Sequence, residues 1–224
     1  MYLPIFWHKV IEIFDKVNLN IPLFLFAKAP IAGKVKTRLQ SHCSAEQSAE
    51  IAKILLEESI IKASKYWPGK VYLSVALDAE HPFLMSMLEK YSKELVQQQA
   101  GDLGNKMHHT FEEFGYPAAI MGCDAPHIAY HDLQKAYQYL ESSQPVLGPS
   151  EDGGYYFIGL HKSSPALFSG IDWGTSSVLQ STISISKQIE IEFQYLESLN
   201  DVDEWSDLMS VSEYYPALQK IIEN

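Results

Sequence analysis

Residues 21–39 read IPLFLFAKAPIAGKVKTRL and decide the fold class of this chain. Their first part, residues 21–27, is a short and nearly unbroken apolar run, which is typical of a parallel strand buried on both faces. A proline and a glycine follow, and the cationic side chains close behind the strand are Lys28, Lys34, Lys36 and Arg38. A strand that enters a glycine-bearing cationic loop and then a helix can bind phosphate through free amides and side-chain charge. The stretch therefore predicts an α/β fold with an anion-binding loop after its first strand.

Outward from this stretch, predicted strands and helices alternate along the chain. Apolar periodicity separates the two kinds of element, with Ser44 as a helix cap and Pro82 in the first turn of another helix. The predicted strands cover residues 21–27, 70–77, 94–100, 116–122, 144–150, 153–160 and 189–195. The predicted helices cover residues 45–67, 81–91, 104–114, 131–142 and 175–187, and two short ones follow Asp203. This alternation implies a mostly parallel sheet with right-handed crossovers.

Residues 1–20 precede the first strand, and their apolar side chains recur at roughly helical spacing. They predict an amphipathic helical extension, whereas residues 21–224 predict a single domain without linker or repeat. Charged side chains interrupt the extension long before the ~20 apolar residues that a membrane span needs, and no signal-peptide pattern is present. We expect the helix to pack on the domain or on a second subunit of a homodimer. Phe6 and Trp7 beside Lys9 keep a membrane-surface anchor open as the alternative.

Composition limits the class of protein and of partner. The chain has 224 residues, of which 46% are hydrophobic and 20% charged, as in an ordinary globular protein. Its net charge of −11 argues against a nucleic-acid-binding protein, which would present a broad basic face. Cys43 and Cys123 form neither a disulfide framework nor a zinc motif, and they suit a reducing cytoplasm, where we expect the protein to act.

The cationic loop matches neither of the common phosphate-loop patterns. In the Walker A pattern, Lys28 would take the place of the first glycine and Val35 that of the final hydroxyl residue; the dinucleotide pattern needs three glycines, and the loop has only Gly33. A basic surface turn with nothing bound is the alternative, but a proline and a glycine between strand and helix favour a diphosphate. The residues that we expect to hold it are Lys28, Gly33, Lys34, Lys36 and Arg38.

Two acidic motifs supply candidate metal ligands. GCDAP (122–126) places Asp124 directly after a buried strand, where a carboxylate can bind a hard divalent cation that bridges phosphates. NDVDE (200–204) offers Asp201 and Asp203 after a late strand, and we predict Asp203 as the second ligand. In both motifs the alternative is a cap of the helix that follows.

SEDGG (150–154) places two carboxylates before paired glycines. Gly153 and Gly154 would let the backbone approach a sugar, while Asp152 or Glu151 serves as a general base. An ordinary turn, whose glycines take positive φ, is the alternative.

Two more motifs suit a nucleotide or an acceptor. In AGDLGNKM (100–107), Asp102 and Gly104 precede a helix and fit either a helix cap or a contact with ribose or sugar. In WGT (173–175), Trp173 could form a wall of the acceptor pocket, and burial in the core is the alternative.

The motifs FAKAPIAGKVKTRL, AGDLGNKM, GCDAP, GPSEDGGYYFIGL, IDWGTSSVL and NDVDEWSDL occur in this order. Together they resemble the bacterial glycosyltransferase-like family linked to arsenosugar biosynthesis, which is related to 2-phospholactate guanylyltransferase and molybdenum-cofactor guanylyltransferase. The resemblance covers residues 21–209 and implies a GT-A-type nucleotide-diphospho-sugar transferase fold, a Rossmann-like three-layer α/β/α sandwich that uses Mg²⁺ or Mn²⁺. It places Asp124 at the family's metal-binding aspartate, and Lys28, Lys36 and Arg38 at its phosphate-loop cations.

Three features depart from that family's pattern. Lys106 stands where an arginine is expected before Met107, Glu204 stands where a threonine is usual, and residues 1–20 are an addition. The first two departures bear on substrate choice or activity.

The sequence thus predicts a metal-dependent glycosyltransferase with a nucleotide diphospho-sugar donor and a small-molecule acceptor. One alternative is a nucleotidyltransferase that joins an NTP to a phosphorylated substrate, and another is a nucleotide-sugar binding protein without turnover. The same cationic loop and metal ion would serve each of them.

Overall fold

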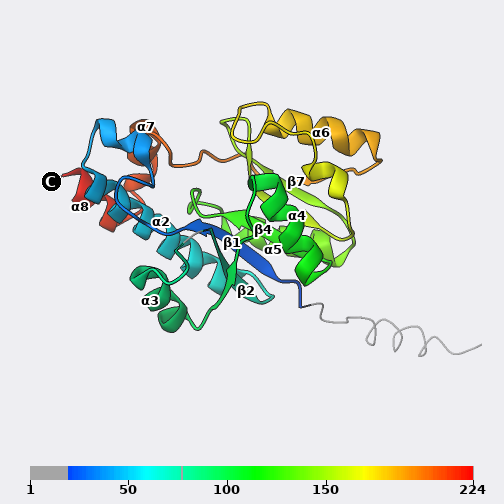
Figure 1. Cartoon of the computed structure of the whole chain (residues 1–224), viewed down its shortest axis with the longest axis horizontal. Coiled ribbons are helices and arrows are strands. Elements are labelled where there is room, and N and C mark those ends of the chain that lie inside the picture. Colours follow the sequence, from blue (N-terminus) through cyan, green and yellow to red (C-terminus); the bar gives the residue numbers. More distant parts are fainter. Residues whose placement is uncertain (1–19, 77, 224) are drawn as a thin grey trace, which may run out of the picture.

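The computed structural model describes residues 20–76 and 78–223, and a seven-stranded sheet forms its centre (Figure 1). The strands are β1 (Leu23–Lys28), β2 (Val71–Ala76), β3 (Glu94–Gln97), β4 (Ala118–Gly122), β5 (Val146–Pro149), β6 (Tyr155–Leu160) and β7 (Gln194–Tyr195). They lie in the order β3-β2-β1-β4-β6-β5-β7. Only β6 runs antiparallel to its neighbours among the described strands, so the predicted mostly parallel sheet is confirmed.

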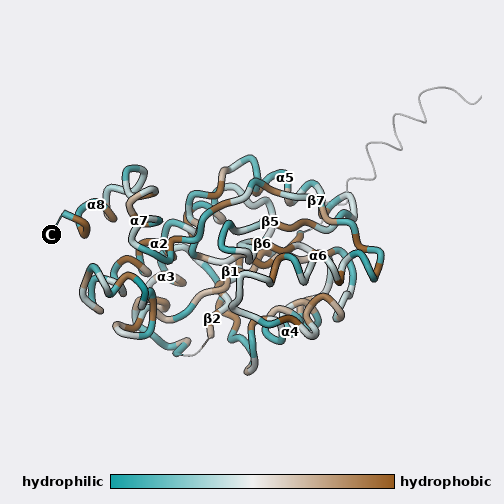
Figure 2. The backbone as a smooth tube through the Cα atoms, turned by 90° about the horizontal axis from the view of Figure 1, so that it is seen from above, coloured by the Kyte–Doolittle hydropathy of each residue, from teal (hydrophilic) through white to brown (hydrophobic). Residues whose placement is uncertain are grey.

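Helices cover both faces of this sheet and complete the predicted three-layer sandwich. One face packs against α2 (Ala45–Tyr66), α3 (Pro82–Tyr91) and α5 (Tyr130–Glu141). The other packs against α4 (Leu103–Phe114), α6 (Val178–Gln188) and the short 3₁₀ helix η2 (Pro165–Phe168). In Figure 2 the strands β5 and β6 run between α5 and α4.

The remaining helices extend the layer of α2. The 3₁₀ helix η1 (Thr37–Ser41) follows the cationic loop, and α7 (Trp205–Ser212) and α8 (Pro216–Ile222) end the described chain. Leu39, Leu55, Leu208 and Leu218 join these elements in a separate buried cluster, and Figure 1 shows α7 and α8 beside α2. The cluster therefore fixes the far end of the cationic loop against the C-terminal helices.

The apolar run that opens the first motif forms β1, the central strand. Leu23, Leu25 and Ala27 pack under α2 and α5, whereas Phe24 packs on the opposite face under α4. Successive side chains of a strand point to opposite faces, so a strand covered on both sides needs apolar residues at every position. That need explains why the run is nearly unbroken.

The predicted strand at residues 189–195 is wrong for most of its length. Only its last two residues pair, as β7, while Ile189 ends α6 and Glu190 takes a positive φ of 56°. Ile191 and Phe193 are buried in the cluster around α4 and α6. The alternating apolar residues thus belong mostly to a loop, which anchors the side chains of Ile191 and Phe193 in the core.

Other local predictions agree with the structure. Ser44 and Gln47 form a capping box at the start of α2, and Pro82 occupies the first turn of α3. The helical extension predicted for residues 1–20 lies outside the described residues except for Asn20. None of the helices in the described residues is long and apolar enough to cross a membrane.

Five polar loops come together at one edge of the sheet. β1, β3 and β4 end there, and because β6 runs backwards, the turn 150–154 between β5 and β6 lies at the same edge. The segment after β7 crosses this edge: Glu151 N donates to Leu199 O (3.0 Å), and Val202 N donates to Asp124 O (2.9 Å). These bonds hold three of the loops together.

Candidate active site

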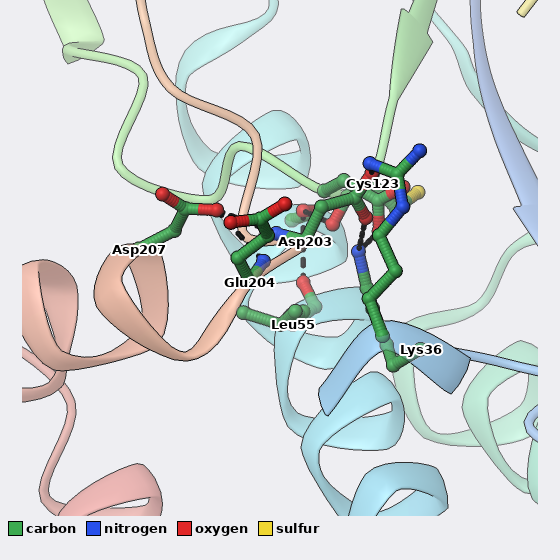
Figure 3. A network of polar contacts seen from close by, with 9 residues as sticks. Lys36, Leu55, Cys123, Asp203, Glu204 and Asp207 are labelled. Carbon is green, nitrogen blue, oxygen red and sulfur yellow. Dashed lines mark hydrogen bonds and ion pairs between the residues drawn. The ribbon is translucent and has the colours of Figure 1, made fainter. Parts of the chain in front are cut away.

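The ammonium group of Lys36 lies between two carboxylates that are far away in the sequence (Figure 3). Lys36 Nζ is 2.5 Å from Asp124 Oδ1 and 2.9 Å from Asp203 Oδ1. The lysine side chain is only 6% exposed, against 52% for Asp124 and 40% for Asp203. Burial opposes its charge, but the two carboxylates outweigh this effect and raise the pKa of Lys36. The site therefore has a buried cation at its centre.

The backbone of the cationic loop aims Lys36 at these carboxylates. Lys36 has φ 46° and ψ 42°, a left-handed conformation that is uncommon for residues other than glycine. Before it, the Lys34 amide donates to Ile31 O (2.9 Å) in a turn where Gly33 has φ 77°. After it, Leu39 is fully buried under η1. Unfavourable backbone conformations of this kind cluster at functional positions.

Asp201 joins the acidic cluster, and the sequence interpretation passed over it in favour of Asp203. Its Oδ1 is buried and has no hydrogen-bond partner in the described part of the chain. Burial, and then the nearby charges of Asp124 and Asp152, raise the pKa of Asp201 to about 7. The signal that could have found it is the spacing of two residues from Asp203, because such residues share one side of an extended segment.

Asp124, Asp201 and Asp203 do not cap the helices that follow them, since the capping box of α7 is formed by Glu204 and Asp207. This removes the main alternative to a binding role. The helix after Asp124, α5, begins without a side-chain cap. At α7, Asp207 Oδ2 accepts hydrogen bonds from the amides of Asp203 (3.2 Å) and Glu204 (2.7 Å), as Figure 3 shows. The carboxylates of Asp201 and Asp203 are consequently left to face Lys36 and its surroundings.

The other cations of the loop are open to solvent. Lys28 and Lys34 are exposed, and the side chain of Arg38 is 65% exposed, with Nη1 3.6 Å from Asp203 Oδ2. The charges of Lys36, Arg38 and Lys28, in that order, outweigh burial and lower the pKa of Asp203. Three accessible cations thus surround the buried one.

Two open hollows flank the loop. The larger measures about 530 Å³ and is lined by Arg38, Ser41, His42, Glu204, Trp205 and Ser206. The smaller measures about 410 Å³ and is lined by Ile31, Lys34, Asp78, Glu80 and His81. A ligand bound to the loop has space on either side of it.

The turn 150–154 brings Asp152 to the acidic cluster. Asp152 Oδ1 accepts a hydrogen bond from Gly154 N (2.9 Å), which fixes the carboxylate on the turn. Gly153 has φ 91°, and a Cβ atom there would lie 2.1 Å from Ser176 O. Gly153 is therefore required by the backbone, whatever it also does for a ligand.

Asp102, Gly104 and Trp173 have structural roles that the sequence left open. Asp102 Oδ1 caps α4 by accepting a hydrogen bond from Asn105 N (2.8 Å). A Cβ atom on Gly104 would lie 2.4 Å from Trp173 Nε1, so the glycine admits the indole ring. Trp173 is half-buried and meets Tyr155 edge to face, with ring centroids 6.4 Å apart. Their contacts with a ribose, sugar or acceptor stay predictions.

The predicted site residues thus fall into three groups at one edge. The group around the buried lysine comprises Lys28, Gly33, Lys34, Lys36, Arg38, Asp124 and Asp203. The group beside the start of α4 comprises Asp102, Gly104 and Trp173. The turn 150–154 carries Glu151, Asp152, Gly153 and Gly154, and the charge of Asp152 acts on Asp201.

The donor set suits a hard divalent cation. Within residues 20–76 and 78–223, no group of three Asp, Glu, His or Cys side chains lies close enough together in this structure to hold a metal ion. Nevertheless, the side chains that converge are carboxylates, which Mg²⁺ and Mn²⁺ prefer. A cation already sits between Asp124 and Asp203, and Asp201 offers an unpartnered oxygen. Asp124 and Asp203 would hold the ion once Lys36 has moved.

Comparison with known protein families identifies the family of this chain. Residues 60–175 match the model of a family described as uncharacterized protein conserved in bacteria (DUF2064). The chain belongs to the DUF2064 family. No curated protein matches it.

Two of the solved structures that are similar to this DUF2064 chain are described as transferases. A protein from Desulfovibrio desulfuricans G20, provisionally described as a nucleotide-diphospho-sugar transferase, is 26% identical with a TM-score of 0.80, and the match covers 91% of this chain and 97% of that one. The inositol-1-phosphate CTP transferase from T. maritima is 15% identical with a TM-score of 0.59, covering 92% and 98%.

A third similar structure contains a metal ion. Rv0371C from Mycobacterium tuberculosis H37Rv, in complex with manganese, is 11% identical with a TM-score of 0.54, and the match covers 86% of this DUF2064 chain and 98% of that one. At this identity, as for the T. maritima enzyme, the likeness shows the fold alone. That fold is the one predicted from the sequence.

Proposed function

We propose that this chain is a metal-dependent glycosyltransferase whose donor is a nucleotide diphospho-sugar. The observation that carries the proposal is the buried ammonium of Lys36 between Asp124 and Asp203, at the sheet edge where β1 and β4 end. Ligands of open α/β sheets bind at this edge. The description of the D. desulfuricans protein, which is 26% identical, supports the donor class.

The cationic loop is proposed to bind the diphosphate. The protein has a net charge of −11, so an anionic ligand needs a local group of cations. Lys28, Lys34 and Arg38 are accessible around the loop and supply it. Each charge-assisted hydrogen bond to phosphate would contribute about 1.5–3 kcal/mol.

The reaction breaks the bond between the anomeric carbon and the diphosphate oxygen. The electron pair of that bond leaves with the nucleoside diphosphate, and the fixed charges of Lys28, Lys34 and Arg38 stabilise the charge that develops there. A divalent cation, when bound, would neutralise more of the same charge. The hydroxyl of the acceptor forms the new bond to the anomeric carbon.

The proton of that hydroxyl needs a base, and the turn 150–154 provides one. Asp152 is exposed and is oriented by its hydrogen bond from Gly154 N (2.9 Å). A base that is held by the backbone loses little freedom when it binds the acceptor. Glu151 is the second candidate on the same turn.

A nucleotidyltransferase is the second candidate function, because the fold of this chain also occurs in the T. maritima inositol-1-phosphate CTP transferase. In that reaction a phosphorylated substrate would attack the α-phosphate of an NTP, and pyrophosphate would leave. The same cations and acidic cluster would serve both reactions, so the reaction products must separate them.

The test is an assay of products with Mn²⁺ present. One arm contains a mixture of nucleotide sugars and a broad panel of acceptors, and the other contains NTPs with phosphorylated substrates. We expect nucleoside diphosphate from the first arm, formed slowly even with water as the acceptor. Asp152→Asn is the matched variant, and it should lower the rate while donor binding persists.

Pyrophosphate from the second arm, with every nucleotide sugar intact in the first, would instead establish the nucleotidyltransferase. Binding of nucleotide sugars with neither product would leave a binding protein.

A further inference from the structure

We propose that Lys36 is a built-in counter-ion of the acidic cluster, so that the site takes up a divalent cation only together with a di- or triphosphate. This inference rests on the proposed function and makes it more specific. The substrate of the binding step would be the metal–nucleotide complex, and the free metal ion would bind poorly.

The first step of the argument is that Lys36 and a metal ion exclude each other. Lys36 Nζ lies 2.5 Å from one carboxylate oxygen of Asp124 and 2.9 Å from one of Asp203. A magnesium ion would need those oxygens at about 2.1 Å. Two cations within such a space would repel each other, and water screens the lysine side chain little because it is only 6% exposed. Lys36 must therefore leave before an ion binds.

The second step is that Lys36 has nowhere favourable to go while no anion is bound. Its side chain is 6% exposed, and its ion pairs in the described part of the chain are those with Asp124 and Asp203. A buried ion that loses its partners destabilises the protein, because its charge is then neither paired nor hydrated. Free metal would have to overcome this cost from its own contacts.

The third step is that a diphosphate removes the cost. Arg38 follows Lys36 by two positions, is exposed and lies 3.6 Å from Asp203, so a phosphate bound by it would lie beside the acidic cluster. That phosphate would offer the displaced ammonium a new partner and add oxygen ligands for the ion. Metal and nucleotide then help each other to bind, by the same factor in both directions.

The chain offers a matched control in Lys187. It carries the same side chain, is exposed in the last turn of α6, and has no ion pair in the described part of the chain. Lys187→Gln and Lys36→Gln change the net charge equally. Only Lys36→Gln removes the competitor from the acidic cluster.

The test measures Mn²⁺ binding through the electron paramagnetic resonance signal of the free ion. Without nucleotide, wild type should bind Mn²⁺ weakly, Lys36→Gln at least about tenfold more tightly, and Lys187→Gln much like wild type. A nucleoside diphosphate should tighten Mn²⁺ binding by wild type at least about tenfold, and that of Lys36→Gln by less. Circular dichroism shows whether each variant folds. The effect of the nucleotide on Mn²⁺ binding by wild type can be measured even if a variant does not fold.

Two results would overturn the inference alone: equal binding of free Mn²⁺ by the Lys36→Gln and Lys187→Gln proteins, or wild-type binding that the nucleotide does not tighten. If no folded protein bound Mn²⁺ even with nucleotide, the metal dependence of the proposed function would fail as well.

Discussion

The positive charge of Lys36 offsets the mutual repulsion of the carboxylates in the acidic cluster. Asp124 and Asp203 both contact Lys36, and Asp201 lies close enough for the charge of Asp124 to raise its pKa. Several carboxylates at one place cost free energy in the folded state unless a cation or protons balance them. The cluster therefore favours a cationic ligand, and the open lysines around it favour an anionic one.

A buried carboxylate outside the site provides a stability prediction. Asp132, in the first turn of α5, is 2% exposed, and burial raises its pKa although His131 Nε2 lies 3.8 Å away. A raised pKa means that the ionised group costs stability above the ordinary value of 3.8, and that the cost disappears below it. We expect Asp132→Asn to stabilise the protein at pH 7, because the amide removes a buried charge.

Urea unfolding of both proteins between pH 7 and pH 3 measures this difference. The gain should shrink as the pH falls toward 3.8. A gain that is independent of pH would show that ionisation of Asp132 is not its source.

At the scale of elements, the start of α4 and the loop that carries Trp173 depend on a single glycine. A Cβ atom on Gly104 would lie 2.4 Å from Trp173 Nε1 and 2.5 Å from its Cε2, so the ring would have to move. We expect Gly104→Ala to lower the free energy of unfolding by about 1–3 kcal/mol. Asn105→Ala, at an exposed neighbour on the same helix, should change it less.

Thermal unfolding and tryptophan fluorescence report on this variant together. A destabilised protein with altered fluorescence supports the packing role of Gly104. Unchanged stability with a loss of nucleotide affinity would instead make Gly104 a ligand contact and refute that role.

For the whole molecule, the sequence predicted the features that depend on local chemistry. The unbroken apolar run of residues 21–27 predicted a buried central strand, and Ser44 predicted the start of α2. Long-range pairing could not be predicted in the same way. The apolar pattern of residues 189–195 does not reveal that its side chains anchor a loop, because a strand and a buried loop can share this pattern.

The candidate site shows the same limit. The cations of the loop and the aspartates at the strand ends were predicted from residue type and place. The choice of Asp124 and Asp203 as partners of Lys36 depends on how three loops meet, and Glu204 with Asp207, rather than Asp201 or Asp203, forms the capping box of α7. Neither fact is a property of one segment of the sequence.

The net charge of the protein should restrict nucleotide binding to the candidate site. The net charge of −11 repels nucleotides from most of the surface, so binding should depend on the cationic loop and on a metal ion. Salt should weaken this binding, since the loop cations are exposed and therefore screened.

The central claim is that Asp124 carries a divalent cation on which nucleotide binding depends, and calorimetry with a nucleoside diphosphate tests it most directly. The titrations compare wild type, Asp124→Asn and Glu113→Gln, an exposed site on α4 with the same change of charge, with and without Mn²⁺. We predict that Mn²⁺ tightens binding at least about tenfold in wild type and in Glu113→Gln but not in Asp124→Asn, while all three stay folded. Equal Mn²⁺-dependent affinity in Asp124→Asn and wild type would contradict the account.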